Sequence, residues 1–142
     1  MATTKSNEQI AYEATPSRQV AGYKTAQIVY VERICTTASG DTTGTVYQFF
    51  KPPVGWKLLK DQSSLEFEAT GFTDVNLGDE EDENRYLDAE DISSAGETVG
   101  DFLVDHVIDE NTGWIQATVQ AGGSVTADKD ITAKLYFSAP GT

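Results

Sequence analysis

SSLEFEATGF, residues 63–72, carries the clearest secondary-structure signal in the sequence. Apolar Leu65, Phe67 and Ala69 alternate with two glutamates, so every second side chain is apolar. A β-strand points successive side chains to opposite faces, whereas a helix would repeat its apolar positions every three or four residues. We therefore expect a strand whose Leu65, Phe67 and Ala69 face a core while its glutamates face water.

The same alternation recurs towards the end of the chain, in WIQATVQA (114–121) and DITAKLYF (130–137). Their apolar faces are predicted to consist of Ile115, Ala117, Val119, Ile131, Ala133, Leu135 and Phe137. Further strand-like runs cover residues 24–35, 45–50, 56–60 and 101–108, with loops rich in Gly, Pro, Asn or Asp between most of them. Only residues 88–96 suggest one or two helical turns, which Gly96 would end.

About seven or eight short strands without a long amphipathic helix predict an all-β protein. We expect an antiparallel β-sandwich that is jelly-roll-like. An immunoglobulin-like sandwich is the rival, but Cys35 is the only cysteine, so the Cys–Trp–Cys framework of that fold is absent. We assign this sandwich domain to residues 24–142.

Residues 1–23 have no sustained period, and Pro16 prevents a long uninterrupted helix. We interpret them as an extended N-terminal arm whose apolar side chains, Ile10, Tyr12 and Val20, are candidate contacts with another protein surface or a second subunit. Residues 1–24 have a net charge of +1, while the rest of the chain carries −14. Such an arm can lie on an acidic neighbour, or it can be an ordinary unstructured tail.

Composition excludes several classes of protein. The 142 residues are 39% hydrophobic and fit one domain with a real core. No apolar run approaches the ~20 residues of a membrane span, and residues 1–19 lack the apolar stretch of a signal peptide, so we expect cytoplasmic synthesis and no membrane partner. The net charge of −13, with scattered Lys and Arg, disfavours nucleic acid as a partner.

An acidic run from Asp79 to Asp91 contains eight acidic residues and one basic residue. An EF-hand-like count would use the carboxylates of Asp79, Glu81, Glu83 and Glu90. However, Asn84 stands where that loop requires Gly, and no helices flank it. We therefore predict no metal site and expect a loop whose Arg85 pairs with a flanking carboxylate.

No catalytic constellation is evident. Cys35 lies in a strand-like run, as an inert half-buried thiol would, and a nucleophile elbow of the form G-x-S-x-G does not accompany His106. The glycine-rich phosphate loops G-x-G-x-x-G and G-x-x-x-x-G-K-[ST] are missing, so no nucleotide cofactor is expected. With 23 acidic residues, some pair will meet glycosidase spacing by chance, so a carboxylate hydrolase ranks last. We predict no enzyme, no cofactor and no catalytic residues.

Three segments resemble small β-rich virion proteins of tailed bacteriophages. They are VNLGDEEDENRYLDAEDISSAG (75–96), YQFFKPPVGWKLL (47–59) and SVTADKDITAKLYF (124–137). The likeness lies in the order of residue types, such as Leu-Gly-Asp followed by an acidic loop and Arg-Tyr-Leu. It implies a head decoration (cement) protein or a head or tail fibre component, with a β-sandwich fold, acting as a homo-oligomer that is often a trimer.

The resemblance thus implies a non-enzymatic protein of the virion's capsid surface. Its expected partners are the major capsid protein and further copies of itself, as a homotrimer. The alternative is a carbohydrate-binding fibre head or lectin-like module, for which Trp56 and Trp114 are candidate stacking faces.

Overall fold

The computed structural model describes residues 27–121 and 125–140, so the expected arm, with Ile10, Tyr12 and Val20, lies outside the described residues. The described part contains no helix, and none of its segments is a helix long and apolar enough to cross a membrane. It is built from β1 (Gln27–Thr36), β2 (Val46–Phe50), β3 (Lys57–Leu58), β4 (Ser64–Phe67), β5 (Asp74–Asp79), β6 (Leu87–Glu90), β7 (Gly96–Glu97), β8 (His106–Val107), β9 (Ile115–Ala121) and β10 (Asp130–Ala139).

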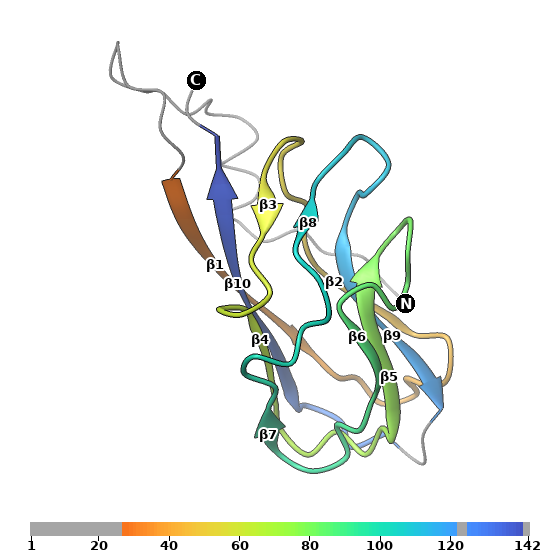
Figure 1. Cartoon of the computed structure of the whole chain (residues 1–142). Coiled ribbons are helices and arrows are strands. Elements are labelled where there is room, and N and C mark those ends of the chain that lie inside the picture. The colour runs from red at the N-terminus through yellow and green to blue at the C-terminus, as the bar shows by residue number, and fades with distance from the viewer. Residues whose placement is uncertain (1–26, 122–124, 141–142) are drawn as a thin grey trace.

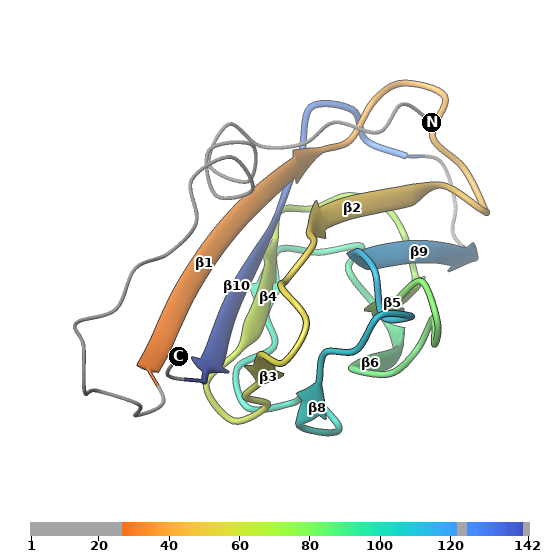
Figure 2. The ribbon, with the colours of Figure 1, turned by 90° about the horizontal axis from the view of Figure 1, so that it is seen from above.

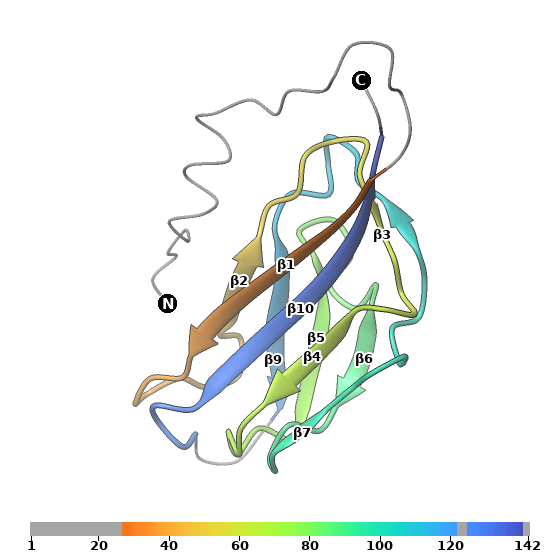
Figure 3. The same cartoon turned by 90° about the vertical axis from the view of Figure 1, so that its left-hand side faces the viewer.

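Two antiparallel sheets face each other, which confirms the predicted β-sandwich. In the first sheet, β10 pairs along its whole length with β1, from Gln27 opposite Ala139 to Thr36 opposite Asp130. On its other side β10 pairs with β4 and then with β3, and β7 and β8 lie beyond these two. Strand β1 therefore forms one edge of the sheet, and β7 and β8 form the opposite edge (Figures 1 and 3).

The second sheet has the order β2-β9-β5-β6. The chain crosses repeatedly between the two sheets. The first sheet contains β1, β3, β4, β7, β8 and β10, and the second contains β2, β5, β6 and β9. Figure 2 shows the two layers from above. Such crossing connections between two antiparallel sheets belong to a β-sandwich, and the jelly-roll-like topology stays a prediction.

The core fills the space between the sheets. Phe137 of β10 lies at its centre, with its ring centroid 5.7 Å from that of Phe50 and 5.5 Å from that of Trp56. The alternating positions that the sequence predicts to face inward in β9 and β10 are buried; they are Ile115, Ala117, Val119, Ile131, Ala133, Leu135 and Phe137. The apolar alternation therefore predicts correctly which face of β9 and of β10 is buried.

The segment 63–72 follows its prediction only in part. Leu65 and Phe67 are buried, but β4 ends at Phe67 and Ala69 is exposed. Thr70 is buried in its place, because its hydroxyl donates a hydrogen bond of 2.7 Å to the carbonyl oxygen of Ile92. A satisfied polar group thus replaces the predicted apolar contact.

The predicted helical turns at 88–96 are wrong. This segment contains the end of β6 and the start of β7, and Ala89 has a positive φ of 57° that no helix allows. The Ile92 N–H donates to the carbonyl oxygen of Phe72 at 3.0 Å, so the backbone here bonds to a distant segment. A helix would have used that group within its own turns.

The predicted strand at 101–108 is also mostly wrong, since only His106–Val107 forms β8. Phe102 and Ile108 are buried, but Val104 is exposed. The backbone N–H of Leu103 donates to the carbonyl oxygen of Tyr86 at 2.9 Å, which holds the chain in an irregular path instead of a ladder.

Candidate functional site

The first part of the acidic run, residues 80–86, is a loop that folds around Asp79, the last residue of β5, and the rest of the run includes β6. This carboxylate is 1% exposed and accepts the backbone N–H groups of Glu81 at 3.0 Å and Asp82 at 2.9 Å. The guanidinium Nε of Arg85 donates to its other oxygen at 2.7 Å. The buried charge is therefore both hydrogen-bonded and paired, and the expected pairing of Arg85 with a flanking carboxylate is confirmed.

Arg85 connects the two sides of the loop. Besides Asp79, it binds the Glu81 carboxylate at 3.0 Å. Burial lowers the pKa of Arg85, but its hydrogen bond to Asp79 and the charge of that carboxylate outweigh burial and raise the pKa above its usual value. Tyr86 and Leu87 follow directly and are buried, so the end of the loop is anchored in the core.

Gly78 allows the loop to fold back onto β5. A Cβ at this position would overlap the carbonyl oxygen of Asp82 and the backbone of Glu83. The Asp79 N–H donates to that same Asp82 oxygen at 3.0 Å, so loop and strand are in direct backbone contact. Only glycine leaves room for this contact.

Replacing Gly78 with Ala is expected to lower the free energy of unfolding by about 3 kcal/mol, the upper part of the usual range for overpacking, because both obstacles are backbone atoms. Urea unfolding monitored by tryptophan fluorescence measures the change. Gly40→Ala is the comparison variant: nothing lies within 4 Å of its Cβ position, so it measures the cost of a positive φ alone, which Gly78 does not have. If Gly78→Ala costs no more than Gly40→Ala, the tight loop contact is wrong.

The four carboxylates of the calcium-like count do not form a cage in the described residues. Asp79 is held by Arg85, and Glu83 accepts hydrogen bonds from the side-chain amides of Asn76 and Gln120. Glu90 lies on β6, beyond the loop. Asp79 and Glu83 thus bind separate groups of the protein instead of converging on one point.

One trio of possible metal ligands does meet in the part of the chain that the structure describes, namely Glu81, His106 and Asp109, with ligand atoms within 4.8 Å of one another. Its members already have protein partners. Arg85 neutralises Glu81, while Thr112 lies 3.0 Å from His106 Nε2 and donates its hydroxyl to Asp109 at 3.1 Å. These contacts account for the trio without an ion.

Cys35 has the environment of a structural thiol. Its side chain is half-buried between the sheets, with Sγ 3.5 Å from the carbonyl oxygen of Gln48. Burial raises the pKa of the thiol to about 11, so the thiolate that would act as a nucleophile is scarce at neutral pH. This supports the interpretation of Cys35 as inert.

The two tryptophans are core residues. Trp56 is 7% exposed and Trp114 is 8% exposed, so neither presents a ring face to a ligand. The exposed aromatic pair is instead Tyr30 and Tyr136, opposite each other on β1 and β10 with ring centroids 4.7 Å apart. The candidate residues for stacking against a sugar are therefore these two tyrosines and not the tryptophans.

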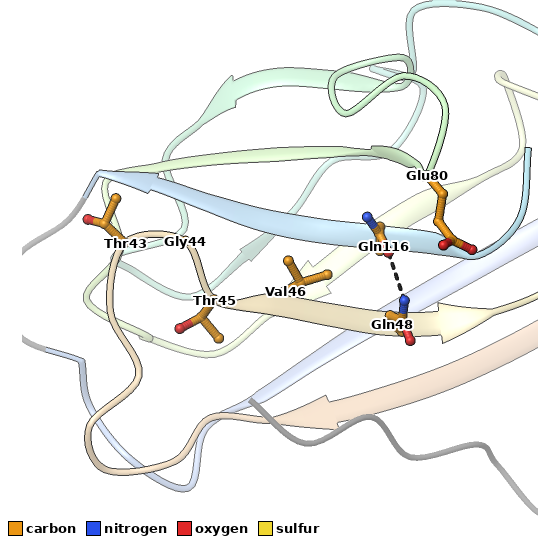
Figure 4. Close-up of a pocket in the computed structure, with 7 residues that line it drawn as sticks. All are labelled: Thr43, Gly44, Thr45, Val46, Gln48, Glu80 and Gln116. Carbon is orange, nitrogen blue, oxygen red and sulfur yellow. Dashed lines mark hydrogen bonds between the residues drawn. The ribbon is translucent and has the colours of Figure 1, made fainter.

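A polar hollow of about 530 Å³ lies over β2 and β9 (Figure 4). The Gln48 side-chain amide donates to that of Gln116 at 3.0 Å across the two strands. The hollow is lined by Thr43, Gly44, Thr45, Val46, Gln48, Glu80 and Gln116. This lining offers hydroxyl, amide and carboxylate groups but no aromatic ring or cation, so it is a poor platform for a sugar or an anion.

Two apolar strips stand out on the surface, and sequence reasoning missed both. The β1 strip consists of Ile28, Tyr30 and Ile34, which are 46–65% exposed. The 99–107 strip lies at the opposite edge of the same sheet; its members, 41–63% exposed, are Val99, Leu103, Val104 and Val107. Clustered exposed apolar side chains of this kind mark contact sites between proteins.

Comparison with known proteins gives one informative result. No protein family and no curated protein matches the sequence. A chain in the structure "Cyanophage Pam1 capsid asymmetric unit" has a similar fold, with a TM-score of 0.67 and 19% sequence identity. The alignment covers 99% of this chain and 100% of that chain, so the two share a fold over their whole length.

Proposed function

We propose that the protein is a non-enzymatic structural component of a bacteriophage virion, which decorates or cements the capsid. The observation that carries this proposal is the full-length likeness in fold to a chain of the cyanophage Pam1 capsid asymmetric unit. The resemblance of the acidic loop and the closing strand to phage virion proteins supports the same role. So do the buried tryptophans and the structural thiol, which suit a building block better than an enzyme.

In this role the protein is a homo-oligomer, a trimer in the proposal, on the outer surface of the capsid. Its partners are the major capsid protein and further copies of itself. Ile10, Tyr12 and Val20 of the arm are the proposed contacts. Ordering an arm costs about 1–2 kcal/mol per residue, so a docked arm must bury apolar side chains to bind at all.

Replacing Ile10, Tyr12 and Val20 together with Ser is expected to weaken binding to capsids at least 100-fold, because each lost apolar contact is worth about 1.5–3 kcal/mol. Co-sedimentation of the full-length variant with capsids that lack this protein measures the effect. The wild type should also raise the melting temperature of those capsids, and the variant should not.

The matched control replaces the neighbouring polar residues Gln9, Thr15 and Gln19 with Ser and should bind normally. Undiminished binding by the apolar triple variant would place the capsid contact on the sandwich instead of the arm. A wild-type protein that neither binds capsids nor stabilises them would contradict the decorating role itself.

A carbohydrate-binding fibre head is the second candidate, and the ring pair of exposed Tyr30 and half-buried Tyr136 favours it. Aromatic rings on a sheet face offer sugars a stacking surface. A glycan array separates the two roles, because a decorating protein should bind no glycan. A fibre head should bind a defined glycan and lose it when Tyr30 is replaced with Ala.

A further inference from the structure

We infer that copies of this protein associate head to tail, with the β1 strip of one copy packed against the 99–107 strip of the next. This inference rests on the proposed function in one respect, since it identifies the surfaces through which the proposed homo-oligomer forms. It commits to a second copy of the chain as the occupant of both strips.

The β1 strip lies on an open edge. Within the described residues β1 pairs with β10 alone, and it does so over ten residues, which is long for an exposed edge strand. Proteins that stay monomeric usually protect such edges with charges, prolines or bulges. The charged residues of β1 are Glu32 and Arg33, and the apolar side chains of Ile28, Tyr30 and Ile34 are exposed beside them. An edge of this kind is suited to contact another protein chain.

The 99–107 strip is held in place from within. Phe102 stacks on Tyr86 with ring centroids 5.8 Å apart, and the Leu103 N–H donates to the Tyr86 carbonyl oxygen. The Asp105 carboxylate accepts the Lys60 N–H at 2.8 Å. Because these contacts fix the backbone, Leu103 and Val104 are presented to solvent by an ordered segment. Little conformational entropy is then lost when a partner covers them.

Charge favours contact between unlike strips. Residues 96–110, which run from β7 to just beyond β8, contain five acidic residues and no Lys or Arg, so two copies of this edge would repel each other. Residues 27–51, which include β1, hold two acidic and two basic residues and are neutral. An acidic edge meets a neutral edge at lower electrostatic cost than it meets itself.

The position of the strips then determines the symmetry. They lie at opposite edges of one sheet, so a contact between them uses a different surface on each copy. Such a heterologous contact leaves one free strip of each kind on a dimer and closes into a ring when the rotation between copies allows it. A two-fold contact, by contrast, would use the same strip twice and stop at a dimer.

Two full-length variants test this inference, Ile34→Glu on the β1 strip and Leu103→Glu on the 99–107 strip. Both positions are exposed, so neither change should alter the melting temperature. Thr43→Glu, on an exposed loop away from both strips, is the control for added charge. Sedimentation velocity at tens of micromolar protein should show a closed oligomer for the wild type and the control. Each strip variant should be monomeric, with self-affinity at least 100-fold weaker.

Mixing the two strip variants distinguishes the geometries. Ile34→Glu keeps an intact 99–107 strip and Leu103→Glu keeps an intact β1 strip, so a head-to-tail mixture should form heterodimers and nothing larger. If Leu103→Glu alone still associates while Ile34→Glu does not, the β1 edge pairs with itself and the inference is wrong. A monomeric wild type also overturns it, and would point to residues 1–26 of the same chain as the cover of the β1 strip.

If Leu103→Glu lowers the melting temperature by more than a few degrees, Val104→Glu on the same strip takes its place.

Capsid co-sedimentation of the same variants separates this inference from the proposed function. A wild-type monomer that binds capsids would remove the head-to-tail contact and leave the decorating role in place. A head-to-tail oligomer without affinity for capsids would remove the decorating role and leave the head-to-tail contact in place.

Discussion

Replacing Arg85 with Ala is expected to lower the free energy of unfolding by about 3 kcal/mol, because it leaves the Asp79 carboxylate buried without its countercharge. The expected loss lies at the low end for a broken buried pair, since Asp79 keeps two backbone N–H donors. Guanidinium or urea unfolding of the purified protein measures it. The acidic loop should open first, because Arg85 also binds Glu81.

Two comparison variants isolate the buried pair. Lys60→Ala removes an exposed cation that lies 3.5 Å from Asp61, and should change stability by less than about 0.5 kcal/mol. Adding Asp79→Asn to Arg85→Ala should recover part of the loss, because the remaining buried group is then neutral. An Arg85→Ala protein as stable as Lys60→Ala would show that Asp79 does not depend on this partner.

Replacing Phe137 with Ala is expected to cost about 3–5 kcal/mol of unfolding free energy, the usual range for a large-to-small change in a core. Its ring is fully buried between those of Phe50 and Trp56, and it lies on β10, where β1 and β3 pair on either side. The cavity would open between the two sheets, because Phe50 belongs to β2 of the second sheet. Near-ultraviolet circular dichroism should show loss of fixed aromatic packing at lower denaturant concentration.

Phe137→Leu is the matched control, because it keeps an apolar side chain at the same place and should cost less than half as much. Tyr136→Ala tests the adjacent position on the outer face of the sheet, where the side chain is only half-buried. A Phe137→Ala loss no larger than that of Tyr136→Ala would contradict the central place of this ring in the core.

The strands that the sequence predicts well have one buried and one partly exposed face. In β9 and β10, Ile115 and Ile131 begin alternations of apolar and polar residues that translate directly into burial. In such strands a single apolar side chain at every second position is enough to define the core face.

The residue pattern of β5 does not predict a strand, because its sequence DVNLGD is mostly polar and yet is buried over most of its length. Asn76 illustrates the reason. Its side-chain oxygen accepts the Ala89 N–H at 2.8 Å, and its amide donates to Glu83 at 3.2 Å. These partners come from other segments of the fold, so no local pattern of residues announces them. The false helix at 88–96 has the same cause.

The sequence likewise predicts one of the candidate functional sites and misses another. The sequence identifies Arg85, Tyr86 and Leu87 as the anchor of the acidic loop, because one cation and two apolar residues stand out within an acidic run. It does not identify the β1 strip. Both faces of β1 are rich in apolar residues, and only the fold shows that Val31 lies inward while Ile34 lies outward.

Gln27 pairs with Ala139, so the first residue of β1 and the last residue of β10 lie next to each other. Tension applied between these two residues would pull β1 and β10 apart from that end, so their hydrogen bonds would bear the load in succession rather than together. Strands that are unzipped in this way separate at lower force than strands that are sheared along their length. The domain would therefore resist longest when the load enters through one end of the chain or through the face of its sheet.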